Sequence, residues 1–411
     1  MFISYGALFF ITIAICMFLL VVTAMIPKTA IQSHCEESAE FFEQQVPFPR
    51  IKIQKANTTI DYYSDCILLN IIYCMDNKHP FSSAISAQYY SKNTVDINHS
   101  FMEVVRYQRE ENMDYSRYWH GSIVFLRPLL CLTNIQGIYK CLTIIFGILF
   151  VIVEYILFRQ KQWWMIIIYP LALCSVKLWI VARCVEYINM FMWMEIMVIC
   201  YLLLERRGNR TIYCLSIVNG VVTCFLDFLT TETIAITVPL FMLCVLRRSR
   251  QEKSDGKKEV KFVITSLGIW GCSYGGMIVI KWLLSWGILG NKVLNNTFQR
   301  IGERVSGNPL ETIGRNICVM FSAGENVVMV MALGYAIAVI WFIGYAVLYS
   351  RKNNNWTMMS NMILLLVPYL RYVILSNHAK IHCFFTYRSQ LIVILIMSCS
   401  ICNAVNRKLQ R

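Results

Sequence analysis

The sequence predicts an all-α integral membrane protein with ten transmembrane helices and a large extracytoplasmic loop after the first of them. Of its 411 residues, 57 % are hydrophobic and 15 % are charged, whereas about 25 % of the residues in soluble domains are charged. The apolar residues form runs as long as a helix that crosses a bilayer, and they do not alternate with polar residues as in barrel strands. These observations exclude a soluble enzyme, a fibrous or disordered protein and an outer-membrane barrel.

The apolar runs give the expected spans in chain order. They cover residues 5–26, 138–158, 163–182, 187–204, 211–228, 232–246, 261–283, 325–349, 357–376 and 388–406. The first run has no basic segment before it, so we expect a retained helix rather than a cleaved signal peptide. The chain thus divides into a first helix (1–26), an extracytoplasmic loop domain (27–137) and a nine-helix transmembrane domain (138–411) with an outer loop at 284–324.

The positions of Lys and Arg predict the orientation. Of the 38 Lys and Arg residues, 17 lie in the connections and tail at 159–161, 206–210, 247–261, 351–352 and 407–411. With ten helices these segments share one side, which the positive-inside rule makes cytoplasmic. We therefore expect a multi-pass protein of the plasma membrane with both termini in the cytoplasm. The net charge of +14 is explained by this orientation, and no motif indicates a nucleic-acid partner.

The segment 27–137 is the most informative part of the chain. It contains 12 of the 24 acidic residues, and a loop of this length with elements of its own is usually functional. Its apolar stretch 66–75 is about half the length of a spanning helix, so we expect a helix at the membrane interface or buried in the outer domain.

Glu36 and Glu37 follow the first helix closely and are candidates for a general base. If a helix begins at Ser33, Glu37 shares a face with Phe41, and partial desolvation there would raise its carboxyl pKa. Glu36 lies on a different face. The alternative is an ordinary solvated start of a helix.

Arg117, His120 and Arg127 form a second group of candidates. Their spacing puts them on one face if the segment is helical, and Pro128 would end or kink that helix. Because an unpaired guanidinium in an apolar run is costly, Arg127 should have an anionic partner. That partner is either a carboxylate of the loop or a lipid phosphate, which a guanidinium can bind through two hydrogen bonds.

Asp227 closes one expected span and Glu232 opens the next, in a short apolar turn. They are either an ordinary capping turn or site carboxylates that could bind a cation. The segment near the C-terminus combines basic and histidine side chains, namely Arg371, His378, His382 and Arg388. This group favours recognition of a phosphate. Two His residues four apart could also bind a metal, and structural hydrogen bonding is the third alternative.

Lys177 and Glu195 are expected at similar depth in two neighbouring spans. Charged residues at such depth usually pair, so we expect a structural ion pair or the wall of a polar cavity.

The arrangement resembles a known class. A first helix leads into a large outer loop with acidic residues just past the membrane, many helices follow, and a late outer segment carries Arg and His. This pattern resembles the GT-C class of integral membrane glycosyltransferases, and residues 117–121, 227–230 and 378–388 resemble segments of uncharacterised multi-pass proteins of Gram-positive bacteria. GT-C enzymes typically carry an Asp in the first loop; here Glu36 and Glu37 stand at the matching position.

The resemblance implies transfer of a sugar from a polyprenyl-phosphate carrier to an acceptor at the outer membrane face, in building a cell-envelope polysaccharide. Glu37 or Glu36 would activate the acceptor hydroxyl. Arg127, Arg388 and His378 would hold the departing phosphate. The sequence identifies no cofactor, and a divalent cation is compatible with this chemistry.

Three other functions fit the sequence as well. A transporter or flippase of lipid-linked sugars would use Lys177, Glu195 and Asp227 in a central cavity, but the inverted repeat common in transporters is absent from the sequence. A sugar-polymer polymerase or ligase is a closer rival, although its large outer loop usually comes late in the chain. A non-catalytic membrane scaffold is the third.

Overall fold

Helices make up most of the described residues in a computed structural model of the protein. The structure describes residues 4–53, 56–92, 95–250, 256–321, 325–353 and 356–409. Within these residues, six helices are long and apolar enough to cross a membrane: Tyr5–Ala24, Ile135–Arg159, Val185–Arg207, Asn209–Leu226, Gly256–Leu289 and Cys383–Cys402. The predicted all-α class is therefore confirmed, and these helices coincide with six of the ten expected spans.

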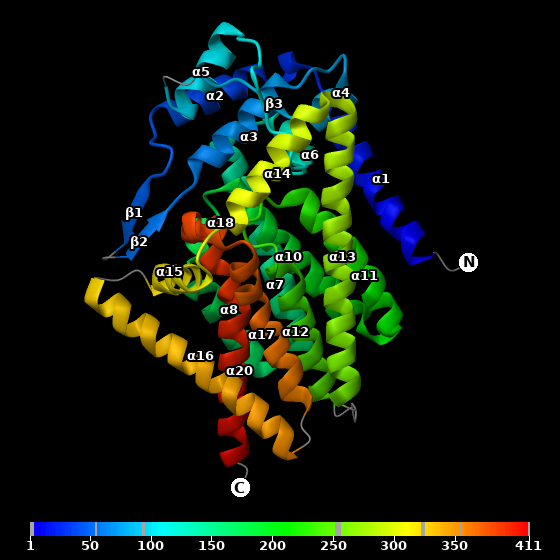
Figure 1. The fold of residues 1–411 in the computed structure, drawn as a ribbon, viewed down its shortest axis with the longest axis vertical. Helices are drawn as coiled ribbons and strands as arrows, with labels where there is room; N and C mark the ends of the chain where they lie inside the picture. The colour runs from blue at the N-terminus through cyan, green and yellow to red at the C-terminus, as the bar shows by residue number, and fades with distance from the viewer. Residues whose placement is uncertain are drawn as a thin grey trace.

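The long helices pack into an elongated bundle (Figure 1). In chain order the elements after the first outer segment are α7 (Ile135–Arg159), α8 (Trp163–Ser175), α9 (Leu178–Val181), α10 (Val185–Leu204), η2 (Glu205–Arg207), α11 (Asn209–Leu226), α12 (Ile234–Ser249), α13 (Gly256–Leu289), α14 (Asn291–Val305), α15 (Pro309–Phe321), α16 (Glu325–Asn353), α17 (Trp356–Ile374), α18 (Ser376–Ile381), α19 (Cys383–Thr386), η3 (Tyr387–Gln390) and α20 (Leu391–Leu409). The expected continuous helix over 163–182 is wrong, because Lys177 adopts a φ of 60° between α8 and α9.

The segment between the first helix and α7 folds at one end of the bundle, called the loop end below (Figure 1). The first helix is α1 (Tyr5–Ala24), and it is followed by η1 (Lys28–Ala30), α2 (Gln32–Glu43), β1 (Arg50–Ile53), β2 (Ala56–Thr59), α3 (Tyr62–Cys74), α4 (Pro80–Ser86), β3 (Gln88–Tyr89), α5 (Ile97–Tyr107), β4 (Met113–Asp114) and α6 (Ile123–Leu130). β1 pairs with β2 and β3 with β4, both antiparallel.

α3 is the centre of this loop end. The apolar stretch 66–75 forms most of it, as predicted, and every residue from Asp65 to Cys74 is buried. Asp61 caps the helix by accepting a hydrogen bond from the Ser64 N–H at 2.9 Å, which satisfies one of the unpaired donors of the first turn. Because α3 packs against α2 and α5, its first turn is held in one place.

The segment before α6 is not helical, contrary to the expectation for residues 117–127. α6 begins only at Ile123, and His120 has a φ of 53°. The Gly121 N–H donates to the Phe225 carbonyl at 2.8 Å, and a Cβ at Gly121 would meet that oxygen at 2.4 Å. This close approach requires glycine, and it turns Arg117 and His120 away from a shared helix face with Arg127.

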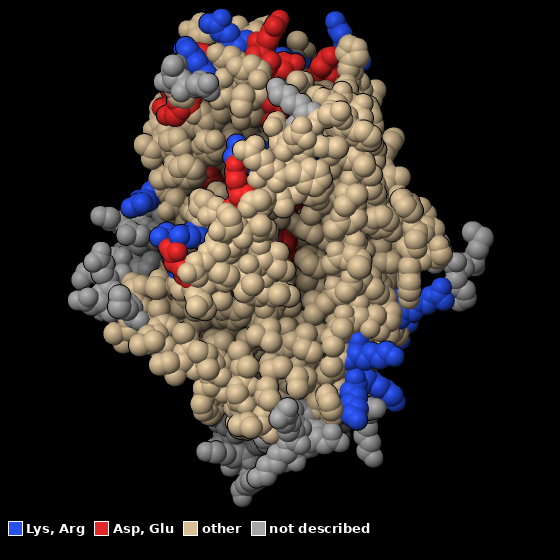
Figure 2. Space-filling model, in the orientation of Figure 1, with Lys and Arg blue, Asp and Glu red and all other residues tan. Residues whose placement is uncertain are grey.

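The opposite end of the bundle gathers several basic connections. Arg250 ion-pairs with Glu205, and Arg247 donates to the side chain of Asn209 at 3.0 Å. Figure 2 shows a group of Lys and Arg side chains near this end with no acidic side chain visible beside it, whereas acidic and basic side chains lie together over the loop end. Connections that we expected on one side of the membrane therefore lie together in the structure, and we call this end the basic end.

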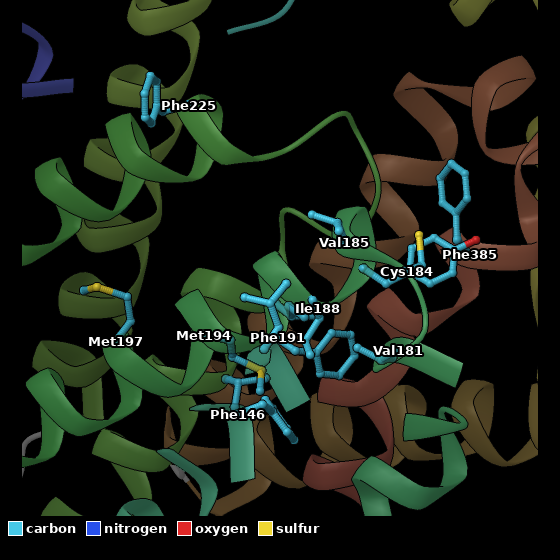
Figure 3. Close-up of a cluster of buried hydrophobic side chains, with 14 of the residues drawn as sticks. Phe146, Val181, Cys184, Val185, Ile188, Phe191, Met194, Met197, Phe225 and Phe385 are labelled. Carbon is cyan, nitrogen blue, oxygen red and sulfur yellow. The ribbon is translucent and has the colours of Figure 1, made fainter. Parts of the chain in front are cut away.

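A buried apolar cluster holds the middle of the bundle together (Figure 3). Phe146 of α7, Val181 of α9, Phe191 and Met194 of α10 and Phe385 of α19 all belong to it. These helices come from distant parts of the sequence, so the cluster fixes where α10 and α19 present their polar residues toward the loop end.

Candidate functional site

A cavity of about 630 Å³ lies at the loop end, within the size range of small-molecule sites. Its walls come from the segment between α1 and α7, the start of α10, α14 and the region of α18 and α19. The charged and histidine side chains that line it are Asp61, Asp114, Arg117, His120, Glu186, Arg300, Arg304, His378 and His382. The cavity therefore combines residues from four distant parts of the chain.

Two carboxyl groups are buried at the cavity wall. Asp61 is 4 % exposed and Glu186 is 6 % exposed, and the two interact electrostatically, with Ser64 contacting both. Burial raises the pKa of Asp61 to about 6, although the hydrogen bonds from Ser64 oppose this shift. Among the described residues, the Oε2 atom of Glu186 has no hydrogen-bond partner. Asp61 is thus mostly ionised at neutral pH and close to the range useful for a general base.

Three histidines face the cavity in the neutral form. His120 donates from Nε2 to the Tyr115 carbonyl at 2.9 Å, and the rings of His378 and His382 lie 4.6 Å apart. Burial lowers the pKa of His120 to about 3 and that of His382 to about 4, and burial also lowers the pKa of His378. The Nδ1 atom of each ring has no partner in the described part of the structure, so each can form a hydrogen bond with a ligand. The Nδ1 atom of His120 can only accept one, because its Nε2 carries the hydrogen.

Arginine side chains complete the cavity. The Arg117 guanidinium lies 4.3 Å from the ring centre of Tyr115, and Arg304 of α14 lies 5.2 Å from that of Tyr118. Arg117 and Arg304 are both half-buried, and the Nε atom of Arg117 finds no acceptor among the described residues. Arg300 is exposed and pairs with Glu303 at 2.8 Å. The cavity can therefore offer two aromatic-held guanidinium groups to an anion.

Glu36 and Glu37 lie outside this cavity. Both are on the exposed face of α2. Glu36 accepts a hydrogen bond from Gln32 at 2.6 Å, and Glu37 accepts one from Asn134 at 2.6 Å. Neither side chain is among those that line the cavity. Their assignment as base stays a prediction, and the geometry favours Asp61.

Arg127 and Arg388 are engaged inside the protein. Arg127 is fully buried and donates to the carbonyls of Ile26 at 2.5 Å and Ile72 at 2.7 Å, which ties the end of α1 to the end of α3. Arg388 donates to the Val176 carbonyl at 3.3 Å. Neither residue lines the cavity, so backbone carbonyls take the place of the carboxylate or phosphate expected for Arg127.

Asp227 and Glu232 lie in the turn between α11 and α12, and Arg371 of α17 contacts this turn. Asp227 accepts hydrogen bonds from the N–H groups of Leu229 and Thr230, and Arg371 ion-pairs with Glu232. Burial raises the pKa of Asp227 to about 7, and Glu232 adds to the shift. These contacts agree with the capping-turn alternative, and none of the three side chains lines the cavity.

The expected ion pair between Lys177 and Glu195 is wrong. Glu195 accepts from the Tyr169 hydroxyl at 2.6 Å, and Lys177 donates to the Val319 carbonyl at 3.0 Å. The break between α8 and α9 turns Lys177 away from α10, where Glu195 lies.

Glu186, Arg304 and Asp61 are not among the site residues that the sequence predicted. An Asp directly before an apolar run is a recognisable helix start, which is the signal available for Asp61. Glu186 and Arg304 enter the site only through packing of α10 and α14. Among the described residues, no group of three or more His, Cys, Asp or Glu is placed to hold a metal ion.

No protein-family model, curated protein or solved structure matches this chain. The cavity is therefore the feature of the molecule that bears on its function.

Proposed function

We propose that this chain is a membrane glycosyltransferase similar to the GT-C class, which transfers a sugar from a polyprenyl-phosphate carrier to an acceptor at the outer membrane face. One observation carries the proposal: the cavity at the loop end combines a buried carboxyl pair from Asp61 and Glu186 with Arg117, Arg304 and neutral histidines. Such a set can accept a proton on one side and stabilise a departing anion on the other.

Asp61 is the general base in this proposal. The oxygen of the acceptor hydroxyl attacks the anomeric carbon of the sugar, and its proton passes to the Asp61 carboxylate. The bond between the anomeric carbon and the phosphate oxygen breaks, and its electron pair stays on the phosphate. General-base help of this kind contributes about 10²–10⁴-fold to a rate. Asp61 is also the first aspartate of the outer segment, which is the residue type that the GT-C resemblance calls for.

Arg117 and Arg304 bind the phosphate of the carrier, whose negative charge increases as the sugar leaves. A planar guanidinium matches two phosphate oxygens, and the tyrosine rings against both guanidinium groups restrict their motion. The neutral rings of His120, His378 and His382 have unpartnered nitrogen atoms among the described residues, which suit hydroxyl groups of a sugar rather than a second charge.

The test compares three amide substitutions in the full chain reconstituted in nanodiscs. A polyprenyl-phosphate hexose is added together with a membrane lipid extract as the source of acceptor, and mass spectrometry follows the released polyprenyl phosphate. Asp61→Asn should lower the rate at least 100-fold, which is about the smallest contribution of a general base. Glu37→Gln tests the sequence-based candidate, and Glu110→Gln changes an exposed carboxylate that is neither on α2 nor among the side chains lining the cavity.

The proposal requires that Asp61→Asn alone loses transfer while its thermal unfolding stays close to that of the parent. If Glu37→Gln loses transfer and Asp61→Asn keeps it, the base lies on α2 and the cavity is not the reaction site. If the parent releases no polyprenyl phosphate from any carrier sugar, the function itself is wrong.

A further inference from the structure

A second hollow lies on the outside of the bundle, where α2, α3, α7 and α9 meet. It is an open groove of about 800 Å³ lined by Phe41, Tyr62, Gln136, Tyr139, Lys140, Thr143, Ile144, Trp179, Ala182 and Arg183. The aromatic side chains form one wall, since Phe41 packs against Tyr62 at 5.5 Å and Tyr62 stacks on Tyr139 at 6.5 Å between ring centres. The groove is therefore a built surface with a fixed aromatic side.

Two exposed cations mark the rim of this groove. Lys140 lies near the start of α7 and Arg183 lies just before α10. No ion pair joins either of them to a carboxylate in the described part of the chain, and none of the described residues that line the groove is acidic. Behind the groove residue Tyr139, the buried Asp65 accepts hydrogen bonds from the Tyr139 hydroxyl at 2.7 Å and from the Val185 N–H. The rim thus presents positive charge without an internal partner.

Away from the two cations, the groove continues onto an exposed apolar face of α7. α7 is a candidate membrane span, and Ile144, Ile148 and Val151 on this helix are each more than half exposed. Cations with Trp and Tyr beside them are typical of the headgroup level of a membrane, and exposed aliphatic side chains farther along the same helix suit acyl chains.

We infer that this groove binds an anionic glycerophospholipid of the bilayer, with its phosphate between Lys140 and Arg183 and an acyl chain along α7. This site goes beyond the sugar-transfer function and does not depend on it. A carrier lipid in transfer must bring its phosphate to the cavity, which has its own arginines. The groove lies across the first turn of α3 from that cavity, because Tyr62 lines the groove whereas Asp61, Tyr63 and Ser64 line the cavity.

The position gives the lipid a defined neighbour. Tyr62 is adjacent in sequence to Asp61, whose carboxyl caps the same turn of α3. A lipid held against Tyr62 therefore packs on the back of the turn that carries one carboxyl group of the cavity. Through this contact the bound phospholipid stabilises α3, and its loss lowers the thermal stability of the loop end.

Binding can be measured on the full chain in nanodiscs by native mass spectrometry, with dioleoyl-phosphatidylglycerol and dioleoyl-phosphatidylcholine as probes. The paired variant Lys140→Gln with Arg183→Gln removes the rim charges. The matched variant Arg206→Gln with Arg207→Gln removes two exposed cations at the basic end. A basic residue near an anionic lipid contributes about fivefold in affinity, so the rim pair should lower phosphatidylglycerol binding about 30-fold. The matched pair should leave this binding near the parental value.

Three results would overturn the inference. If the parent and the variant with both rim substitutions bind phosphatidylglycerol equally, the two cations do not bind its phosphate. Equal binding of the two phospholipids by the parent excludes an anionic ligand. Displacement of phosphatidylglycerol by polyprenyl phosphate, with the rim pair losing both, assigns the groove to the carrier. Should the rim pair not fold, Thr143→Trp fills the groove without a change of charge and must also weaken phosphatidylglycerol binding.

Discussion

Asp61 combines a capping role in α3 with a buried carboxyl group whose pKa burial raises to about 6. A general base acts only when it is deprotonated, so kcat/KM for sugar transfer should fall about tenfold per pH unit below about pH 6. An unperturbed Asp would give this fall near pH 4. The measurement is the rate of polyprenyl phosphate release by reconstituted protein from about pH 4 to pH 8.

The cavity histidines should not cause this fall of kcat/KM at acid pH. Burial lowers the pKa of His120 to about 3 and that of His382 to about 4, so both stay neutral while Asp61 titrates. In His120→Gln, kcat/KM should therefore still begin to fall near pH 6, even if the maximal rate is lower. If the pH at which kcat/KM falls shifts in His120→Gln, the titrating group is His120 and not Asp61.

Arg127 supports the structure rather than the reaction. Its guanidinium donates to the carbonyls at the ends of α1 and α3, and a lysine cannot reach both. Because a buried carbonyl without a donor costs about 1–3 kcal/mol, Arg127→Lys should lower the stability to unfolding by that amount and leave KM for the donor unchanged. Denaturant unfolding in detergent measures the first effect, with the exposed Arg315→Lys as control. If Arg127→Lys keeps the parental stability but binds the donor more weakly, Arg127 binds the phosphate, as the sequence suggested.

At the scale of elements, the sequence was most informative about long apolar helices. Hydropathy alone locates the ends of α1, α7 and α11 to within about three residues, because a bilayer requires one continuous run of apolar side chains. The cap of α3 is also readable, since Asp61 directly precedes its helix. Such features depend on neighbours in the chain and need no knowledge of the tertiary fold.

The cavity could not be predicted in the same way. Glu186 looks like one acid at the start of a span, and Arg304 like one cation on an amphipathic helix, until packing brings α10 and α14 to the same cavity. The break at Lys177 and the left-handed backbone of His120 likewise arise from tertiary contacts. The sequence predicted a helix through 117–122, and only such a helix would place Arg117 on the same face as Arg127.

The role of α14 in the cavity can be tested through one of its side chains. Arg304 lies on this helix beside Tyr118 and lines the cavity. A charge-assisted hydrogen bond contributes about 1.5–3 kcal/mol, so Arg304→Gln should weaken binding of polyprenyl phosphate roughly 10- to 100-fold. Arg315→Gln removes an exposed cation from the adjacent α15 and should not change it. Equal binding by the parent and Arg304→Gln would remove α14 from the site.

The whole molecule has two chemically different ends. The basic end collects cationic connections, and the loop end carries the cavity together with acidic and basic side chains (Figure 2). With the loop end outside, an epitope inserted after Glu110 should bind antibody on intact cells, and one inserted after Gly208 should bind only after permeabilisation. The reverse pattern would put the cavity in the cytoplasm and remove the basis for transfer at the outer face.

The most direct test of the cavity as the transfer site is a cryo-EM structure of Asp61→Asn in nanodiscs with a polyprenyl-phosphate hexose. Loss of the base should leave the donor intact and bound. The account predicts density for the phosphate beside Arg117 and Arg304, with the anomeric carbon of the sugar facing residue 61. Density for the phosphate beside Arg388, in the groove at Lys140, or on α2 near Glu37 would contradict it.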